Sequence, residues 1–414
     1  MQHPWIKWAG IVLMLSVLLA AKLAGGTPPA LFGIRAEFLL FGLTLLGVAL
    51  LHHRTFEVAA TGLVFIVALK LLCVPGFNLG THLWHEASIL INLLGLLLGF
   101  AVLARHFEQS QVPEVLPRFL PDGFMGGFVL LVMVFVLSAF LDNIAAAMIG
   151  GTIAMHVYKG HVDLGFLAAI VAASNAGGAG SVLGDTTTTM MWIAGAPWDC
   201  VLRAYAAAIP ALLFFGPIAA WQQHQVHPIR KDAPAGVRVR WPRLAAVGLI
   251  LVGAITTNVL LDFPAVGVWI AIIVCACLMQ TDWNVVPRSL KGSLFLIALV
   301  TCASLMPVEE LPVASWQTAL GLGFLSAVFD NIPLTKLALD QGGYDWGMLA
   351  YTVGFGGSIL WFGSSAGVAL SNIFPQAKSV SGWLRRGWHI PLAYVLGFFV
   401  MLWTLGWHPF EFPH

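Results

Sequence analysis

One stretch of the chain combines residue types that could bind a cation inside an otherwise hydrophobic segment. Residues 174–192 read SNAGGAGSVLGDTTTTMMW, with four glycines, an aspartate and four consecutive threonines. Asn175, Asp185 and Thr186 would supply side-chain oxygens, the ligands that hard cations such as sodium prefer. Glycine accepts backbone conformations that are closed to other residues, so a helix could unwind here and expose its carbonyl oxygens. The glycines assigned to this unwinding are Gly177, Gly178 and Gly184.

Two Asp-Asn pairs also lie in apolar surroundings. They are Asp142-Asn143, within SAFLDNIAAAM, and Asp330-Asn331, within SAVFDNIPLTK. Asp and Asn are preferred N-caps of helices, and capping alone would explain one such pair. Capping explains two copies less well, because a charge near the bilayer centre costs about 3 kcal/mol and Ser or Thr would cap without it. We therefore interpret both pairs as cation ligands at the tips of two hairpins.

The chain repeats these elements in the same order. After the two Asp-Asn segments come AGGAGSVLGDT (176–186) and FGGSILWFGSS (355–365), each with a Gly-Gly pair and a further glycine six residues on. The glycines of the second copy are Gly356, Gly357 and Gly363. Ser364 takes the place of Asp185 and Gly354 that of Asn175, so the two halves are unequal.

The composition places these motifs in a membrane. Of the 414 residues, 59% are hydrophobic and only 9% are charged, whereas soluble domains are about 25% charged. Apolar runs recur along the chain, and each could cross about 30 Å of hydrocarbon as a helix. The sequence predicts an all-α polytopic membrane protein with about 11 transmembrane segments. A net charge of +1 gives no basis for binding nucleic acid, and no cofactor motif is present.

Basic residues predict the orientation. The polar segment 222–243 contains Arg230, Lys231, Arg238, Arg240 and Arg243 and is expected in the cytoplasm. The charge bias of the other loops is then satisfied only if each Asp-Asn hairpin enters and leaves on one side, as a re-entrant hairpin. This places the N-terminus in the cytoplasm and the C-terminus in the periplasm. The two halves would be inverted-topology repeats, as in secondary transporters with a site near the midplane.

The predicted organisation has four parts. They are an extra N-terminal transmembrane helix (1–30), a first repeat (31–221) with a hairpin at about 107–158 and a broken helix at about 164–193, a cytoplasmic basic linker (222–243), and a second repeat (244–414) with a hairpin at about 312–341 and a broken helix at about 345–374.

Lys336 interrupts an apolar run six residues after Asp330. The long side chain of lysine can reach the membrane surface, so we expect Lys336 to snorkel to the periplasmic side. The alternative is an inward-facing ammonium that forms an ion pair with a site aspartate.

The segment SNAGGAGSVLGDTTTTMMWI, preceded by FLDNIAAAM, resembles the NhaD-type sodium/proton antiporters. In the second half, DNIPL and GGSILWFGSSAGVA look like the same family, and the resemblance runs from about residue 30 to the end. These antiporters belong to the ion transporter superfamily, which includes arsenite carriers and bacterial dicarboxylate and citrate carriers. The resemblance implies a homodimer in which a mobile transport domain moves against a scaffold domain.

The resemblance also implies that hairpin tips and broken helices enclose the cations. A first site, for sodium, would use Asp142, Asn143, Asn175 and Asp185, with Thr186 nearby. A second site would use Asp330, Asn331, Ser358, Ser364 and Ser365. Lys336 departs from the apolar residue expected after DNIPL and could be a charge partner in the second half.

The leading functional hypothesis is a sodium/proton antiporter of the bacterial inner membrane, which could also carry lithium, working by an alternating-access, elevator-like mechanism. Sodium and protons would compete for the same carboxylates. One alternative is a sodium-coupled carrier for citrate or another carboxylate, but the acidic residues would repel such an anion. Another is an arsenite carrier, but no cysteine lies at the motifs. A membrane enzyme or an assembly scaffold is a further class, but the sequence shows no nucleophile-base pair and no soluble domain.

Overall fold

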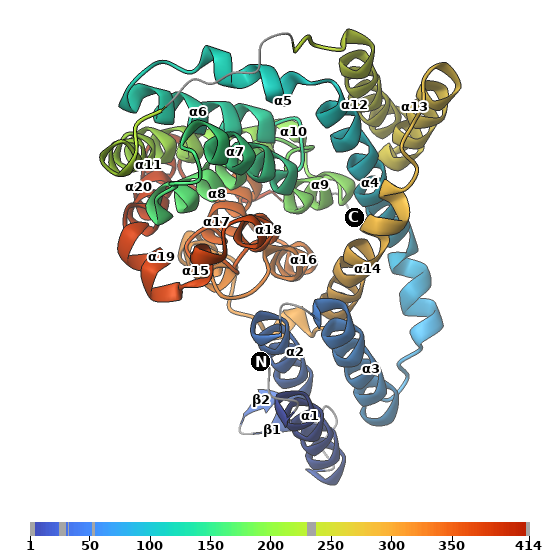
Figure 1. Cartoon of the computed structure of the whole chain (residues 1–414). Helices are drawn as coiled ribbons and strands as arrows, with labels where there is room; N and C mark the ends of the chain where they lie inside the picture. The colour runs from blue at the N-terminus through green and yellow to red at the C-terminus, as the bar shows by residue number, and fades with distance from the viewer. Residues whose placement is uncertain (1–4, 25–29, 32, 52–53, 230–236, 411–414) are drawn as a thin grey trace.

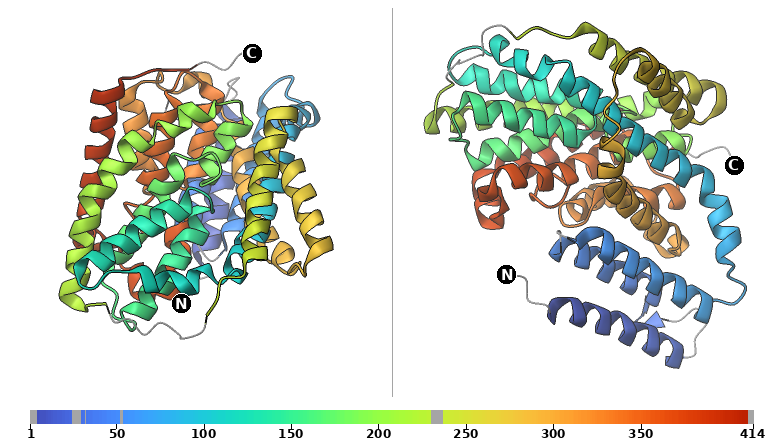
Figure 2. Two further views of the ribbon diagram at one scale, coloured as in Figure 1. Left: turned by 90° about the horizontal axis from the view of Figure 1, so that it is seen from above. Right: turned by 45° about the vertical axis from the view of Figure 1, so that its right-hand side comes forward.

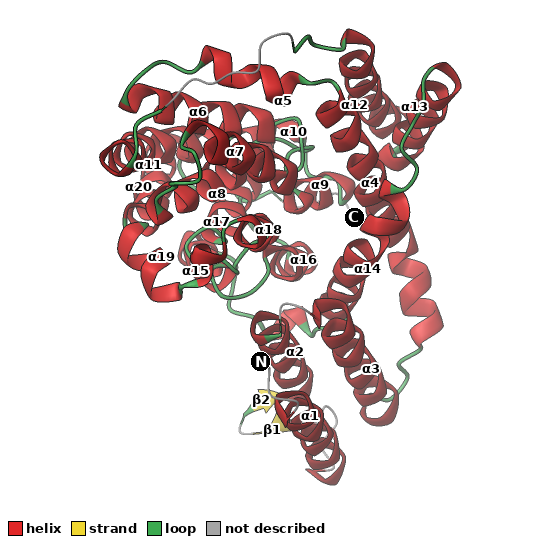
Figure 3. Cartoon of the chain, viewed as in Figure 1, coloured by secondary structure: helices red, strands yellow, loops and turns green. Residues whose placement is uncertain are grey.

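The chain is almost entirely helical (Figure 3). The computed structural model describes residues 5–24, 30–31, 33–51, 54–229 and 237–410. Within these ranges the strands are one antiparallel pair of two residues each, β1 (Ala30–Leu31) and β2 (Ile34–Arg35). Arg230 and Lys231 of the predicted basic linker lie outside the described residues. The prediction of an all-helical chain is confirmed.

The helices pack into two groups (Figure 1). The first group, here the flanking unit, contains α1 (Trp5–Ala24), α2 (Ala36–Leu50), α3 (Thr55–Cys73), α4 (Leu79–Gln109), α12 (Trp241–Leu261), α13 (Pro264–Leu278) and α14 (Val285–Ser304). In this unit α4 packs against α12, α13 and α14, while α3 packs against α2 and α14. Two short elements follow α4, namely α5 (Val112–Val115) and η2 (Leu116–Phe119).

The second group, here the core unit, holds the repeated motifs. Its elements are α6 (Phe124–Ser138), α7 (Asn143–Val157), α8 (Leu164–Ala179), α9 (Thr186–Ile193), α10 (Trp198–Leu202), α11 (Tyr205–Val226), η3 (Val308–Glu310), α15 (Trp316–Ser326), α16 (Asn331–Gln341), α17 (Trp346–Gly356), α18 (Ser365–Ile373), η4 (Pro375–Lys378), α19 (Val380–Arg386) and α20 (His389–Leu405). The centre of this unit is α8 with α17: every residue of α17, and all of α8 after its first, is buried. The right-hand view of Figure 2 shows α1–α3 and α12–α13 outside this unit.

Both groups contain long and short apolar helices. Five helical segments of the described residues are long and apolar enough to cross a membrane alone: Thr55–Cys73, Leu79–Gln109, Trp198–Val226, Trp241–Leu261 and Val285–Ser304. Several other apolar helices are shorter, 10–17 residues, and these include α6, α7 and α8 of the core unit. At 1.5 Å per residue, the 16 residues of α8 extend about 24 Å, less than the roughly 30 Å of a hydrocarbon core.

The segments predicted as broken helices do contain helix interruptions. The segment 164–193 consists of α8 and α9 with a break at 180–185, and 345–374 consists of α17 and α18 with a break at 357–364. The predicted start of the first hairpin at about residue 107 is wrong, because α4 continues to Gln109 and α6 begins only at Phe124.

The end of α4 carries a charged residue that bonds to a loop of the flanking unit. Arg105 follows the apolar part of the helix and donates a hydrogen bond to Asp282, in the loop after α13, at 3.0 Å. This bond holds the pKa of the Asp282 carboxyl below its usual range.

The two units meet through a small number of elements. From the core unit, α9 contacts α4, and α16 contacts α14. The N-cap residues of α9 and α16 are Asp185 and Asp330, two of the aspartates predicted as cation ligands. The candidate site is therefore located at the boundary between the units.

Candidate functional site

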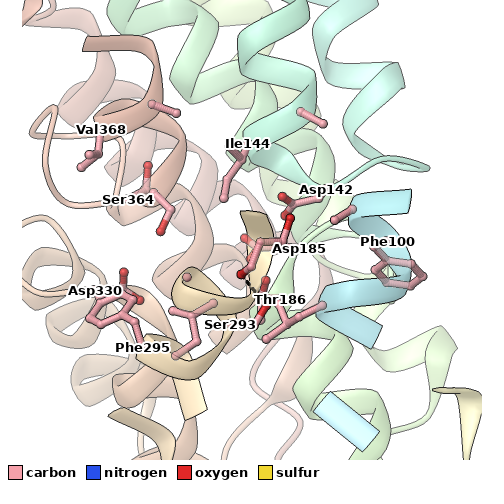
Figure 4. A pocket seen from close by; sticks show the side chains of 18 of the residues that line it. Phe100, Asp142, Ile144, Asp185, Thr186, Ser293, Phe295, Asp330, Ser364 and Val368 are labelled. Carbon is pink, nitrogen blue, oxygen red and sulfur yellow. Dashed lines mark hydrogen bonds between the residues drawn. The ribbon is translucent and has the colours of Figure 1, made fainter. Parts of the chain in front are cut away.

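A cavity of about 620 Å³ lies at this boundary. Its wall on the flanking unit is largely apolar and includes Leu93, Phe100 and Phe295. Its wall on the core unit carries the oxygen-bearing side chains Asp142, Asp185, Thr186, Asp330, Ser364 and Ser365. Figure 4 shows Asp142 and Asp185 close together in this view, with Asp330 and Ser364 on the other side of the opening.

Each of these polar positions is at the start of a short helix. Asp142 is the N-cap of α7, Asp185 of α9, Asp330 of α16 and Ser364 of α18. Such residues accept hydrogen bonds from the otherwise unsatisfied N–H groups of the first helical turn. Four helices therefore direct the positive end of their dipoles toward the cavity.

Capping uses only one oxygen of each of two carboxylates, Asp185 and Asp330. Asp185 Oδ1 accepts a hydrogen bond from the Thr187 N–H at 3.1 Å, and Asp330 Oδ1 accepts one from the Ile332 N–H at 3.1 Å. In each case the second carboxylate oxygen is not used for capping. The side chain of Ser365 lies within hydrogen-bonding range of the Asp330 carboxyl.

Asp185 holds the least satisfied oxygen of the site. The residue is 2% exposed, and its Oδ2 has no hydrogen-bond partner. Burying a carboxylate oxygen without a partner is costly, so a cation or a proton at this oxygen would be strongly favoured. Asp185 is also near enough to Asp142 and Asp330 for their charges to interact.

Three predicted site residues form a buried chain of hydrogen bonds instead of lining the cavity. Asn143 Nδ2 donates to Asn175 Oδ1 at 3.0 Å, and Asn175 Nδ2 donates to Ser358 Oγ at 2.9 Å. All three side chains are buried. The chain ties the start of α7 to α8 and to the break before α18. Asn331, the first residue of α16, is likewise buried and does not reach the cavity wall.

The first-half glycines allow close packing of the backbone. A side chain on Gly177 would collide with the carbonyl of Phe135 in α6, and one on Gly184 with the carbonyl of Ser138. A β-carbon on Gly178 would lie 2.6 Å from the carbonyl oxygen of Gly184. The break is thus folded back onto α8 and pressed against the end of α6.

The second half repeats these contacts. A side chain on Gly356 would collide with the carbonyl of Gly323 in α15, and a β-carbon on Gly363 would lie 2.5 Å from the carbonyl oxygen of Ala327. A β-carbon on Gly357 would lie 2.9 Å from the Gly363 carbonyl oxygen. The same relationship of hairpin helix, glycine pair and break therefore occurs twice.

These contacts correct the reason given for the glycines from the sequence alone. Glycine was expected because it adopts backbone conformations closed to other residues, yet none of Gly177, Gly178, Gly184, Gly356, Gly357 and Gly363 has a positive φ. Their function in the fold is to leave space, because neighbouring backbone lies where a β-carbon would be.

Gly354 has a different environment. It occupies the position of Asn175 in the second half, and it faces Asp185 across the two halves. A β-carbon here would lie 3.4 Å from Asp185 Oδ2 and 3.5 Å from the β-carbon of Ala179, which is ordinary van der Waals contact. The missing side chain therefore leaves open space beside the unpartnered oxygen.

The expectation that Lys336 snorkels to the surface is wrong. Its side chain is 3% exposed, and its ammonium lies 2.9 Å from Glu86 Oε2 and 2.6 Å from Asp340 Oδ1. The alternative of a pair with a site aspartate is not found either, because both partners lie outside the cavity wall. Glu86 comes from α4, and no local sequence pattern connects it with Lys336.

Sequence reasoning also missed side chains that hold the breaks in place. The Tyr205 hydroxyl donates to the Gly177 carbonyl at 2.9 Å, and the Trp383 indole N–H donates to the Ser358 carbonyl at 3.3 Å. Ser326 Oγ donates to the Val353 carbonyl at 2.7 Å. Ser326 was detectable, because Ser138 and Ser326 open the two repeated Asp-Asn segments. Tyr205 and Trp383 lie outside both motifs and gave no signal.

Comparison with known proteins places this architecture in a family. The model of the family described as "Citrate transporter" matches residues 58–356. The chain belongs to this family. It is a multi-pass membrane transporter of the ion transporter superfamily, and it is not an enzyme.

Several similar proteins are named as sodium/proton antiporters. The chain is 26% identical to "Sodium/proton antiporter 1" of Arabidopsis thaliana over 86% of its own length and 71% of the plant protein. It is 25% identical to "Na(+)/H(+) antiporter NhaD" of Alkalimonas amylolytica over 65% of its own length and 67% of that protein. The corresponding protein of Vibrio parahaemolyticus is 26% identical over 58% of this chain and 71% of its own. The resemblance to NhaD-type antiporters predicted from the motifs is confirmed.

The charged side chains of the cavity wall are all acidic. Four carboxylates line the cavity, from Glu108, Asp142, Asp185 and Asp330. Within the described part of the chain, no Lys, Arg or His side chain lines it. Hydroxyl and carboxylate oxygens are ligands for hard cations, whereas an anion would find no opposite charge here.

Proposed function

We propose that the chain exchanges sodium for protons across the membrane, and that lithium can replace sodium. The observation that carries this proposal is the buried Asp185 Oδ2, which has no partner and lies at a cavity whose charged side chains are all carboxylates. The antiporter names of the relatives support the same assignment.

The cation site that we propose in the first half uses Asp142, Asp185 and Thr186 at the cavity, with Asn143 and Asn175 directly behind them. In the second half, Asp330, Ser364 and Ser365 face the same cavity, and Asn331 and Ser358 lie behind. The second half has one aspartate where the first has two, so we assign the sodium ion to the first half.

Coupling follows from competition for these carboxylates. A carboxylate that has been removed from water favours its neutral, protonated form, and a bound cation restores the charged form. Sodium and protons therefore exclude each other at the same oxygens. The core unit would move between its two positions only when either sodium or protons neutralise its carboxylates. Under that condition the uptake of one ion requires the release of the other.

We further propose an elevator-like alternating-access mechanism, in which the core unit moves against the flanking unit. The hairpins α6–α7 and α15–α16 would be re-entrant, and α8–α9 and α17–α18 would be two broken transmembrane helices. The repeated glycine contacts support inverted-topology repeats at 31–221 and 244–414, and the whole chain would have about 11 transmembrane segments.

The cellular setting is part of the proposal. We place the protein in a bacterial inner membrane as a homodimer, with its N-terminus and the basic linker 222–243 in the cytoplasm and its C-terminus in the periplasm.

A sodium-coupled citrate or dicarboxylate carrier is the second candidate, because the family description names citrate and a cavity of about 620 Å³ could hold such a molecule. The four carboxylates of the wall oppose it, since a polyanion would be repelled. Arsenite transport has less support, because none of the five cysteines is among the residues that line the cavity.

Purified protein in proteoliposomes tests the proposal. An inward sodium gradient should drive proton efflux, reported by a pH-sensitive dye inside the vesicles, and citrate should change neither rate nor extent. Sodium uptake that requires citrate, without counter-movement of protons, would replace the antiporter with the carboxylate carrier.

A further inference from the structure

The ion pair between Lys336 and Glu86 joins the two units of the protein. Lys336 is on α16 of the core unit, and Glu86 is on α4 of the flanking unit. Their charged atoms are 2.9 Å apart, and the side chains are 3% and 9% exposed. The other well-buried pairs among the described residues, Arg35–Glu37 and Lys70–Glu37, lie within the flanking unit. Lys336–Glu86 therefore contributes a buried charge contact that must break if the units slide.

The cavity occupies only one half of the flanking unit. Its wall uses the second half of α4, from Leu93 to Glu108, and the first half of α14, from Val285 to Leu296. It also reaches Thr55, the first residue of α3. We call this the open end, because these residues lie where α4 ends and where α3 and α14 begin.

The Lys336–Glu86 pair lies toward the opposite end, which we call the closed end. Glu86 precedes Leu93 by seven residues of α4, about 10 Å along the helix. Lys336 follows Asp330 by six residues of α16, about 9 Å. Both partners are thus displaced from the cavity by a similar distance in the same direction. At this end His82 of α4 also contacts Ser304 of α14, with 3.0 Å between Nε2 and Oγ.

Separating α16 from α4 would affect the two partners differently. Asp340, one turn further along α16, remains 2.6 Å from Lys336, so the lysine would keep a partner. Glu86 would lose the ammonium, which is the ion-pair partner that the described residues give it. A buried charge that loses its partner is strongly disfavoured, so the closed end is stabilised against opening.

We propose that Lys336 and Glu86 form a latch that holds the closed end shut and so sets how often the site faces the other side of the membrane. Lys336 is then a positioning residue: it touches neither the cavity nor the transported ions. This inference rests on the alternating-access mechanism proposed above, but not on which ion is carried.

Accessibility of a cavity residue from each side of the membrane tests the latch. A version in which all five cysteines are replaced by serine would carry one reporter, Val368→Cys, which lines the cavity and is not a proposed ligand. A membrane-impermeant thiol reagent is applied to one face of oriented vesicles at a time. Lys336→Met and Glu86→Gln should each increase labelling from the closed-end face by about tenfold or more.

Charge reversal and a matched control complete the experiment. Glu86→Lys combined with Lys336→Glu restores an ion pair and should return labelling toward the parent. Lys291→Met removes the exposed Lys291–Glu57 pair inside the flanking unit and should change nothing. Glu86→Gln keeps the Lys336–Asp340 pair, so it serves if Lys336→Met does not fold.

Closed-end labelling that stays at the parent level in the folded variants would overturn the latch. The measurement needs no sodium and no transport. The labelling result would therefore still be valid if the protein did not exchange sodium for protons. The exchange assay would likewise still be valid if the latch proposal were wrong.

Discussion

Asn175 Nδ2 donates a hydrogen bond to Ser358 Oγ at 2.9 Å and so joins the two repeated halves of the chain behind the cavity. The other end of the same amide accepts a hydrogen bond from Asn143 at 3.0 Å. One side chain thus positions the start of α7 relative to the break before α18. Since Asp142 precedes Asn143 directly, the position of this carboxylate depends on the same amide.

Asn175→Ala should therefore weaken both the fold and the site. It leaves Asn143 and Ser358 without partners in a buried region, which costs about 1–3 kcal/mol. Asn92→Ala is a matched control, because it also removes a buried amide, one that accepts a hydrogen bond from Ala265, but within the flanking unit. Both variants should melt earlier than the parent. Only Asn175→Ala should lose the rise in melting temperature that sodium produces; an equal loss in both would assign Asn175 to packing alone.

Asp185→Asn and Asp142→Asn should each abolish sodium-driven proton movement while the protein remains folded in the membrane. Each change preserves the shape of the side chain and removes the charge that sodium and protons share. Everted vesicles with a pH-sensitive dye measure the exchange, and Asp262→Asn, in the exposed turn between α12 and α13, is the control. Exchange at the parent rate in Asp185→Asn would limit that residue to capping α9.

Gly354→Ala and Gly178→Ala compare a glycine beside the proposed ion site with a glycine in a close backbone contact. At Gly354 a methyl group fits at ordinary contact distances but lies 3.4 Å from Asp185 Oδ2, so sodium affinity should fall by about tenfold, or 1.4 kcal/mol, with little change in stability. At Gly178 the β-carbon would lie 2.6 Å from a carbonyl oxygen, so the fold itself should be destabilised. Titration of sodium-dependent thermal shifts with both variants measures this. Unchanged sodium affinity in Gly354→Ala would place the ion elsewhere.

Competition between sodium and protons should appear as a pH-dependent KM. As the pH falls, protons occupy a growing fraction of the carboxylates, so the apparent KM for sodium should rise, by up to about tenfold per pH unit for one competing proton. The maximal rate at saturating sodium should change much less. Stopped-flow exchange in proteoliposomes at several pH values, clamped equally on both sides, gives both parameters. A KM that is constant with pH would argue for separate sodium and proton sites.

Much of this protein follows from local features of its sequence. The apolar runs predict membrane helices because a helix satisfies its own backbone in lipid, whatever surrounds it. Asp142, Asp185, Asp330 and Ser364 mark helix starts because N-capping depends on adjacent residues only. The repeated motifs were visible for the same reason, since each is contained within a dozen residues. These local signals selected Asp142, Asp185, Thr186, Asp330, Ser364 and Ser365 on the core side of the cavity but missed Thr189 and Asn372, which also line it.

Only the tertiary structure decided which distant segments meet. The partner of Lys336 is Glu86 on α4, where the sequence suggested the membrane surface or an aspartate of the site. The motif glycines are required by the backbones of α6 and α15, which lie far from them in sequence, and not by their own φ angles. Asn175 and Ser358 come from different halves and act as one structural unit. Such contacts depend on how the two halves pack. The cost of burying a charge and the space available at a glycine are set by distant segments, so neighbouring residues along the chain do not reveal them.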